Sequence, residues 1–211
     1  MRFSDNQIDF LREKIADRLS EKRFSHTLGV LRAAERIGKS FMKIDVSELS
    51  AAALLHDVTK ELCFEEQLAL FFDVGITLSD SDIKSPLILH SLSAPFVVKR
   101  DFPEFATDNV LSAVKNHTTG APGMSLFDEI ILISDYIEDS RTYESCVAVR
   151  DALYSALAAC RTESECEIAL HKSVYESLVF TEMDVIKRGR FLNERSVSTK
   201  AYFASLLCSN E

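Results

Sequence analysis

Residues that interrupt helices are scarce in this chain. Its 211 residues include only 6 glycines and 4 prolines, which argues against many short strands and turns and favours long helices. No apolar run approaches the length of a membrane span. The N-terminal segment, MRFSDNQIDFLREK, is charged and lacks the continuous apolar core of a signal peptide. These absences predict a helical protein located in the cytoplasm.

Basic residues are also in the minority. The 24 lysines and arginines against 33 acidic residues give a net charge of -9. This balance disfavours partners that need a basic footprint, namely nucleic acid and anionic membranes. A phosphorylated substrate would need local cations, either metal ions or a few placed basic side chains. The cysteines are odd in number and form no C-x-x-C pair, so we expect reduced thiols: Cys63, Cys146, Cys160, Cys166 and Cys208.

Hydrophobic periodicity and capping residues predict helices along most of the chain. No alternating pattern of a strand is convincing, so the predicted fold class is all-α. We expect one domain over residues 1–190, with residues 191–211 as an extension packed on it. The helix that starts at Ser85-Pro86 is expected to kink or split at Pro95. The predicted helices begin at Ser4 and then cover about 24–41, 47–57, 63–73, 85 onward, 107–117, 125–143, 162–190 and a short segment within 201–208.

The dipeptide His56-Asp57 follows the apolar residues AALL at the end of a predicted core helix. A buried carboxylate is costly unless something neutralises it, and a divalent cation would do so. Iron, manganese and zinc all accept imidazole and carboxylate ligands, and the sequence does not select among them. Taken alone, however, the dipeptide more often marks a polar helix cap.

Four further residues strengthen the metal hypothesis because they also lie on apolar helix faces or ends. His117 follows Val110 and Val114 on one predicted stripe, and Asp135 follows Ile131 by one helical turn. Rigid helices can aim several such ligands at one point. The full candidate set is His26, His56, Asp57, His90, His117 and Asp135. His171 lies in a mixed-charge helix, so we interpret it as structural or solvent-exposed.

The order His, His-Asp, His, His, Asp resembles the pattern of the extended HD superfamily. The segments RFSHTLGV, AALLHDVTK and LSAVKNHTTGAPGMSLFDEIILISDYIEDSR resemble its YqeK-type branch, the bacterial symmetrical diadenosine tetraphosphate hydrolases, over about residues 21–190. The resemblance implies an HD-domain helical bundle with a dinuclear metal site, iron in the first place, between its helices. It implies that His26, His56, Asp57 and Asp135 bind one ion, that His90 and His117 bind the second, and that Asp57 bridges them.

The activity that this resemblance implies is symmetrical hydrolysis of diadenosine tetraphosphate to two ADP, by attack of a metal-bound hydroxide on a phosphate. Lys60, in HDVTK, would bind a phosphate oxygen unless it is a solvated surface lysine. Arg141 would grip a phosphate or form a surface salt bridge. The residues that follow His117 would form a pocket wall or only a turn: Thr118, Thr119 and Gly120.

Two other functions stay open at this point. The chain could be an HD phosphohydrolase for another nucleotide, such as a nucleotidase or a signalling-nucleotide hydrolase. It could also be a non-catalytic regulatory module that binds metal or nucleotide, although such a module has no need of a complete ligand set. The expected partner is a dinucleoside polyphosphate substrate, with no nucleic acid and no membrane, and a homodimer is left open.

Overall fold

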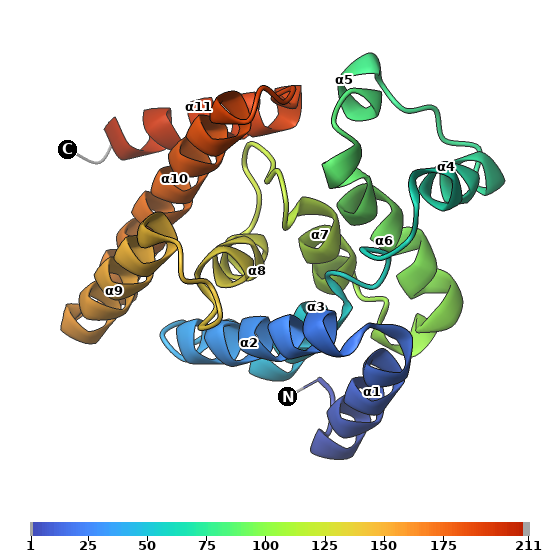
Figure 1. The fold of residues 1–211 in the computed structure, drawn as a ribbon. Coiled ribbons are helices and arrows are strands. Elements are labelled where there is room, and N and C mark those ends of the chain that lie inside the picture. The colour runs from blue at the N-terminus through green and yellow to red at the C-terminus, as the bar shows by residue number, and fades with distance from the viewer. Residues whose placement is uncertain (1, 209–211) are drawn as a thin grey trace.

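The computed structural model describes residues 2–208, and these residues form helices and no strand, which confirms the all-α prediction (Figure 1). No helix among them is both long and apolar enough to cross a membrane. Short 3₁₀ turns cover Pro86–Ile88 and Pro103–Phe105. The α-helices are α1 (Asp5–Arg18), α2 (Glu21–Gly38), α3 (Val46–Leu55), α4 (Phe64–Asp73), α5 (Asp80–Ile83), α6 (Leu89–Asp101), α7 (Asp108–Asn116), α8 (Leu126–Ile137), α9 (Glu144–Ala159), α10 (Glu163–Lys187) and α11 (Glu194–Cys208).

Several helices begin where a capping residue predicts it. The hydroxyls of Ser4 and Ser125 accept hydrogen bonds from the first turns of α1 and α8, and both helices have full capping boxes. Thr107 caps α7 in the same way. These caps matter for the site because α7 and α8 each carry candidate ligands.

The helices surround one main hydrophobic core. α8 lies near the middle and packs against α2, α7 and α10 (Figure 1). α9 and α10 form a hairpin on one side of the molecule, and α4 and α6 lie on the other side. Fully buried Val30, Leu55, Val114 and Ile131 join the candidate ligand helices into this core. Rigid packing around α8 thus fixes the relative positions of α2, α3 and α7.

The helices predicted over 125–143 and from Ser85 onward differ from the structure. The helix expected over 125–143 ends at Ile137, because Glu138 leaves the helical conformation with a ψ of 153°. A separate and unpredicted helix, α9, follows it. α6 is continuous through Pro95, so of the two expected outcomes, a kink or a split, the split does not occur; α6 packs on α4 and α7. Pro86 opens a 3₁₀ turn that leads into α6.

The C-terminal helix, α11, is longer than the predicted short segment. It packs along α10, and its Phe203 is fully buried in the main core. Gly120 has a positive φ of 63°, and an added Cβ would lie 2.6 Å from the Thr199 side chain of α11. The last helix therefore lies against the loop between α7 and α8.

Candidate metal centre

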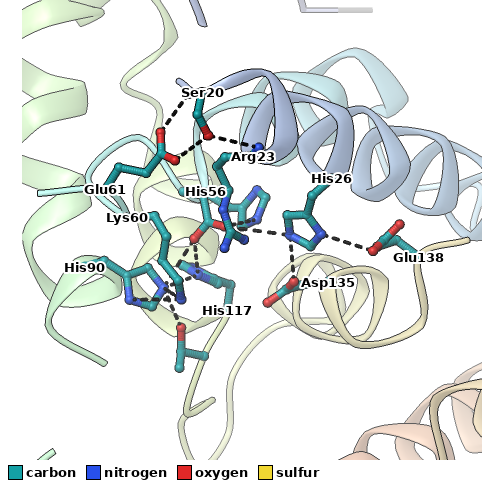
Figure 2. Close-up of polar contacts among 12 residues, drawn as sticks. Ser20, Arg23, His26, His56, Lys60, Glu61, His90, His117, Asp135 and Glu138 are labelled. Carbon is teal, nitrogen blue, oxygen red and sulfur yellow. Dashed lines mark hydrogen bonds and ion pairs between the residues drawn. The ribbon is translucent and has the colours of Figure 1, made fainter. Parts of the chain in front are cut away.

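Helices from distant parts of the chain bring the six candidate ligands together. His26 lies on α2, His90 on α6 and Asp135 on α8. His56 ends α3, with Asp57 directly after it, and His117 ends α7. Figure 2 shows the labelled imidazoles and Asp135 turned toward one interior region.

Asp57 lies at the middle of this cluster and contacts two pairs of imidazoles. Its Oδ2 atom is 3.2 Å from Nε2 of His56 and 3.7 Å from Nε2 of His26. Its Oδ1 atom is 3.3 Å from Nε2 of His90 and 3.6 Å from Nε2 of His117. The two carboxylate oxygens thus face different histidine pairs, which is the arrangement that a bridging ligand requires.

Asp135 completes the cluster on the α8 side. Its Oδ1 atom lies 3.0 Å from Nε2 of His26. In three groups of residues the potential ligand atoms all lie within 4.8 Å of one another, a spacing at which they could share an ion: His26, His56 and Asp57; His56, His117 and Asp135; and Asp57, His90 and His117.

Two imidazoles are oriented by the last turn of their own helix. Nδ1 of His56 is 2.7 Å from the carbonyl oxygen of Ala53, and Nδ1 of His117 is 2.8 Å from that of Val114. A carbonyl can only accept, so each Nδ1 carries the hydrogen and donates it. In the neutral form of each ring, Nε2 then carries the lone pair and faces the centre, as metal ligation requires.

His26 takes its orientation from a carboxylate. Nδ1 of His26 lies 3.1 Å from Oε1 of Glu138, which is 1% exposed. Burial would raise the pKa of Glu138, but hydrogen bonds from His26 and Ser140 lower it to about 2. A Cβ at Gly29 would lie 2.4 Å from Oε2 of Glu138. Gly29 therefore leaves the room in which Glu138 approaches α2.

The electrostatics of the cluster suit a cation. Burial would raise the pKa of Asp57, but His56, His117 and Lys60 hold it well below its usual range. Burial lowers the pKa of both His90 and His117, which keeps these imidazoles neutral. Nε2 of His56 and Oδ1 of Asp57 are buried without a hydrogen bond. Buried polar atoms of this kind are costly, and a divalent cation would satisfy both.

Two basic side chains reach the cluster from its edge. Nζ of Lys60 lies 3.1 Å from Nε2 of His90, so this predicted phosphate ligand does reach the site (Figure 2). Arg23, which sequence reasoning missed, donates from Nη1 to Oδ2 of Asp57 at 2.8 Å. It precedes His26 by three residues on α2, and this spacing is the signal that could have found it.

The remaining predicted site residues divide into two groups. Arg141 donates to Oδ1 of Asp135 at 2.9 Å, and the hydroxyl of Thr118 is 3.1 Å from Nε2 of His90. Thr119 and Gly120 have no contact with the clustered ligands, so of the two alternatives for them, a pocket wall or only a turn, their contacts favour the turn. The Thr119 hydroxyl donates to the carbonyl of Gly120, and Gly120 faces α11 and Leu132.

His171 lies away from the cluster, as interpreted from the sequence. Its Nδ1 atom is 2.8 Å from Oε2 of Glu129, a buried carboxylate on α8. This contact joins α10 to α8 and gives His171 a structural role.

Comparison with known proteins agrees with this geometry. The HD domain family matches residues 23–154, more than half of the chain. The chain belongs to the HD domain family. A crystal structure described as a predicted HD superfamily hydrolase involved in NAD metabolism, from Clostridium acetobutylicum, superposes with a TM-score of 0.80 at 30% identity. The superposition covers 97% of this chain and 98% of the Clostridium acetobutylicum chain.

Curated relatives are similar to this chain over most of its length. A protein of Bacillus subtilis named symmetrical bis(5'-nucleosyl)-tetraphosphatase is 27% identical over 79% of this chain and 83% of its own. A protein of Halalkalibacterium halodurans with the same name is 27% identical over 86% and 88%. The HD fold and the clustered ligands together indicate a hydrolase that binds divalent metal.

Proposed function

We propose that this HD protein hydrolyses diadenosine tetraphosphate symmetrically to two ADP. The observation that carries the proposal is the position of Asp57, whose two oxygens face separate imidazole pairs. Such a carboxylate can bridge two ions, and paired ions suit an in-line displacement at phosphorus. The choice of substrate follows the curated relatives, which align with most of this chain and are named after that activity.

The proposed cofactor is a dinuclear divalent centre, with iron as the metal and manganese or zinc as alternatives that suit the same ligand types. When bound, the ions would lower the pKa of a water molecule and neutralise charge on the phosphoryl oxygens. His90 and His117 would bind one ion, and Asp57 would be shared between both. The residues that would bind the other ion are His26, His56, Asp57 and Asp135.

The basic side chains around the centre have the positions that a polyphosphate needs. The Lys60 ammonium on the His90 side can hold a non-bridging phosphate oxygen, and Thr118 can donate its hydroxyl nearby. Arg23 lies on the Asp57 side. The Arg141 guanidinium, oriented by Asp135, has further N–H groups for a bidentate contact with phosphate. These groups supply local cations in a chain of net charge -9.

Product identification tests the proposal. The metal-loaded protein is incubated with diadenosine tetraphosphate, and the products are separated by chromatography. We expect ADP alone; ATP together with AMP would overturn symmetrical cleavage. NAD and mononucleotides belong in the same assay, because the similar solved structure is described as involved in NAD metabolism. Tight nucleotide binding without turnover, under reducing and iron-replete conditions, would instead support a regulatory module.

Three organisational features remain part of the proposal. We place residues 1–190 and the extension 191–211 in one folded unit, which the burial of Phe203 supports. We expect a cytoplasmic enzyme that acts on a small nucleotide, without nucleic acid or membrane partners. Sedimentation analysis of the metal-loaded protein would decide between a monomer and a homodimer.

A further inference from the structure

A cleft of about 310 Å³ opens beside the metal centre, between α8 and α10. His117 and Asp135, two candidate ligands, belong to its lining, so the cleft is continuous with the centre. Any molecule held by ions at the centre can extend into this space.

The two walls of the cleft come from different parts of the chain. The wall on the α8 side lies within residues 23–154, which match the HD domain family. The opposite wall is α10, Glu163–Lys187, which lies outside that match. The candidate ligands and the wall that faces them therefore come from different parts of the chain. For this reason α10 can contribute to substrate selection without supplying a metal ligand.

The lining is too large and too apolar for a phosphate alone. Pockets for small organic molecules occupy roughly 300–1,000 Å³ and combine apolar walls with a few polar groups. Here Tyr136, Tyr143 and Phe180 supply aromatic surface, while Ser177 and Thr181 supply hydroxyls. Tyr143 is 63% exposed, so one large ring stays accessible at the cleft. Nucleobases stack on such rings.

Charge gives the cleft a direction. Arg141 lines the cleft and is paired with the candidate ligand Asp135, so the positive charge at this end would come from the bound ions, and Arg141 offers its remaining N–H groups beside them. Arg188, also in the lining, is paired with Asp184 by a contact of 2.7 Å, which leaves no net charge on that pair. The cleft thus offers an anion site at its inner end and an aromatic, uncharged environment farther out. A nucleoside diphosphate has the same polarity.

We infer that this cleft binds one nucleoside of the substrate, with its diphosphate passing Arg141 toward the metal centre and its base against Tyr143. The inference rests on the proposed function, because it assigns the ADP half of the dinucleotide to a specific wall. It adds that α10, and Thr181 in particular, shapes the pocket that recognises the nucleoside.

The test compares two ligands that share a diphosphate. ADP and inorganic pyrophosphate are titrated by calorimetry into the manganese-loaded protein and into two matched α10 variants. Thr181→Phe fills the cleft, whereas Met183→Phe adds the same ring at a position that is 59% exposed and outside the lining. Metal content and helical circular dichroism are measured for each protein before titration and metal content again afterwards.

We expect Thr181→Phe to weaken ADP binding by about tenfold or more and to leave pyrophosphate binding unchanged, because only the nucleoside needs the cleft. Met183→Phe should bind both ligands as the unmodified protein does. Unchanged ADP binding in Thr181→Phe, or equal losses for both ligands, would overturn the inference. So would an unmodified protein that binds ADP no more tightly than pyrophosphate.

A second pair of variants, at Tyr143, keeps the inference testable if Thr181→Phe does not fold. Tyr143→Ala should weaken ADP binding by about tenfold, and Tyr143→Phe should retain it, because stacking needs the ring rather than the hydroxyl. Equal ADP binding in Tyr143→Ala and the unmodified protein would count against the inference. A protein that binds ADP in this way but leaves diadenosine tetraphosphate intact would overturn the proposed function and not the cleft.

Discussion

The metal centre and the cleft beside it share His117 and Asp135, yet they are built in different ways. In the centre His56 is 0% exposed and Asp57 is 1% exposed, and the ring orientations are set by backbone carbonyls and by Glu138. In the cleft Tyr143 is 63% exposed and one wall is a single helix, α10. The centre needs fixed ligand positions, because small displacements cost metal affinity. The cleft needs only a shape and a few contacts. Variants that affect one region and spare the other can therefore test this division.

The largest effect is expected for Asp57→Ala. This change removes the carboxylate that lies between both imidazole pairs, so bound metal and turnover should both be lost. Elemental analysis and the diadenosine tetraphosphate assay measure the two losses. Helical circular dichroism serves as the control for folding. Full activity in a metal-free Asp57→Ala protein would refute the metal mechanism.

Lys60→Ala should lower turnover by roughly a hundredfold, the usual effect of losing one electrostatic contact to a reacting group. The Lys60 ammonium lies beside His90 but is not a proposed ligand, so the metal content should not change. Steady-state kinetics and elemental analysis on the same preparation separate the two roles. Loss of metal in this variant would mean that Lys60 is part of the structure of the centre instead.

Glu138→Gln should weaken metal binding by roughly 10–100-fold, because the hydrogen-bond partner of a ligating imidazole fixes its orientation and basicity. Arg141 keeps its contact with Asp135, so ADP affinity measured at saturating metal should change much less than metal affinity. Gly29→Ala offers an independent route to the same defect, since its Cβ would lie 2.4 Å from Oε2 of Glu138. Unchanged metal affinity in both variants would show that Glu138 has no part in positioning His26.

The smallest change for each step is expected in the pH dependence of metal loading, where a step is one pH unit. Burial would lower the pKa of His26, but hydrogen bonds to Asp135 and Glu138 raise it to about 9 in the ion-free protein. An ion must displace that proton, so apparent metal affinity should rise about tenfold per pH unit between pH 7 and about 9. Competition with a metal indicator measures this. A flat profile would mean that His26 is already neutral at pH 7.

The same protonation has the opposite effect on the stability of the ion-free protein. A raised folded-state pKa contributes stability that is complete below the unfolded value of about 6.5 and is lost as the pH rises through about 9. Thermal unfolding of the chelator-treated protein should therefore shift to lower temperature over that range.

The sequence was sufficient to predict the candidate ligands that the fold brings together, and not the groups that position them. His56, His117 and Asp135 could be found because each continues or ends a strongly apolar helix. Glu138 could not, because its role depends on a contact with His26 that is 112 residues away. The same contact explains the error over 125–143. No proline or glycine interrupts that segment, and the helix ends where Glu138 turns toward α2. Gly29, in the middle of a helix, was the available clue.

The cleft was less accessible to sequence reasoning than the centre. Tyr143 precedes α9 and Thr181 lies on α10, and no spacing in the sequence indicates that they line one cleft. α9, which connects them, was not predicted at all. A wall assembled from such residues becomes visible only when the hairpin of α9 and α10 is placed against α8 (Figure 1).

The ligands of the centre come from α2, α3, α6, α7 and α8, and from positions that span 26 to 135. An incompletely folded chain cannot bring them together, so we expect ion binding to follow folding. An ion that binds only the finished fold adds about 2.7 kcal/mol to its stability when free metal is roughly 100 times the dissociation constant. The free metal concentration would then set the stability of the folded chain.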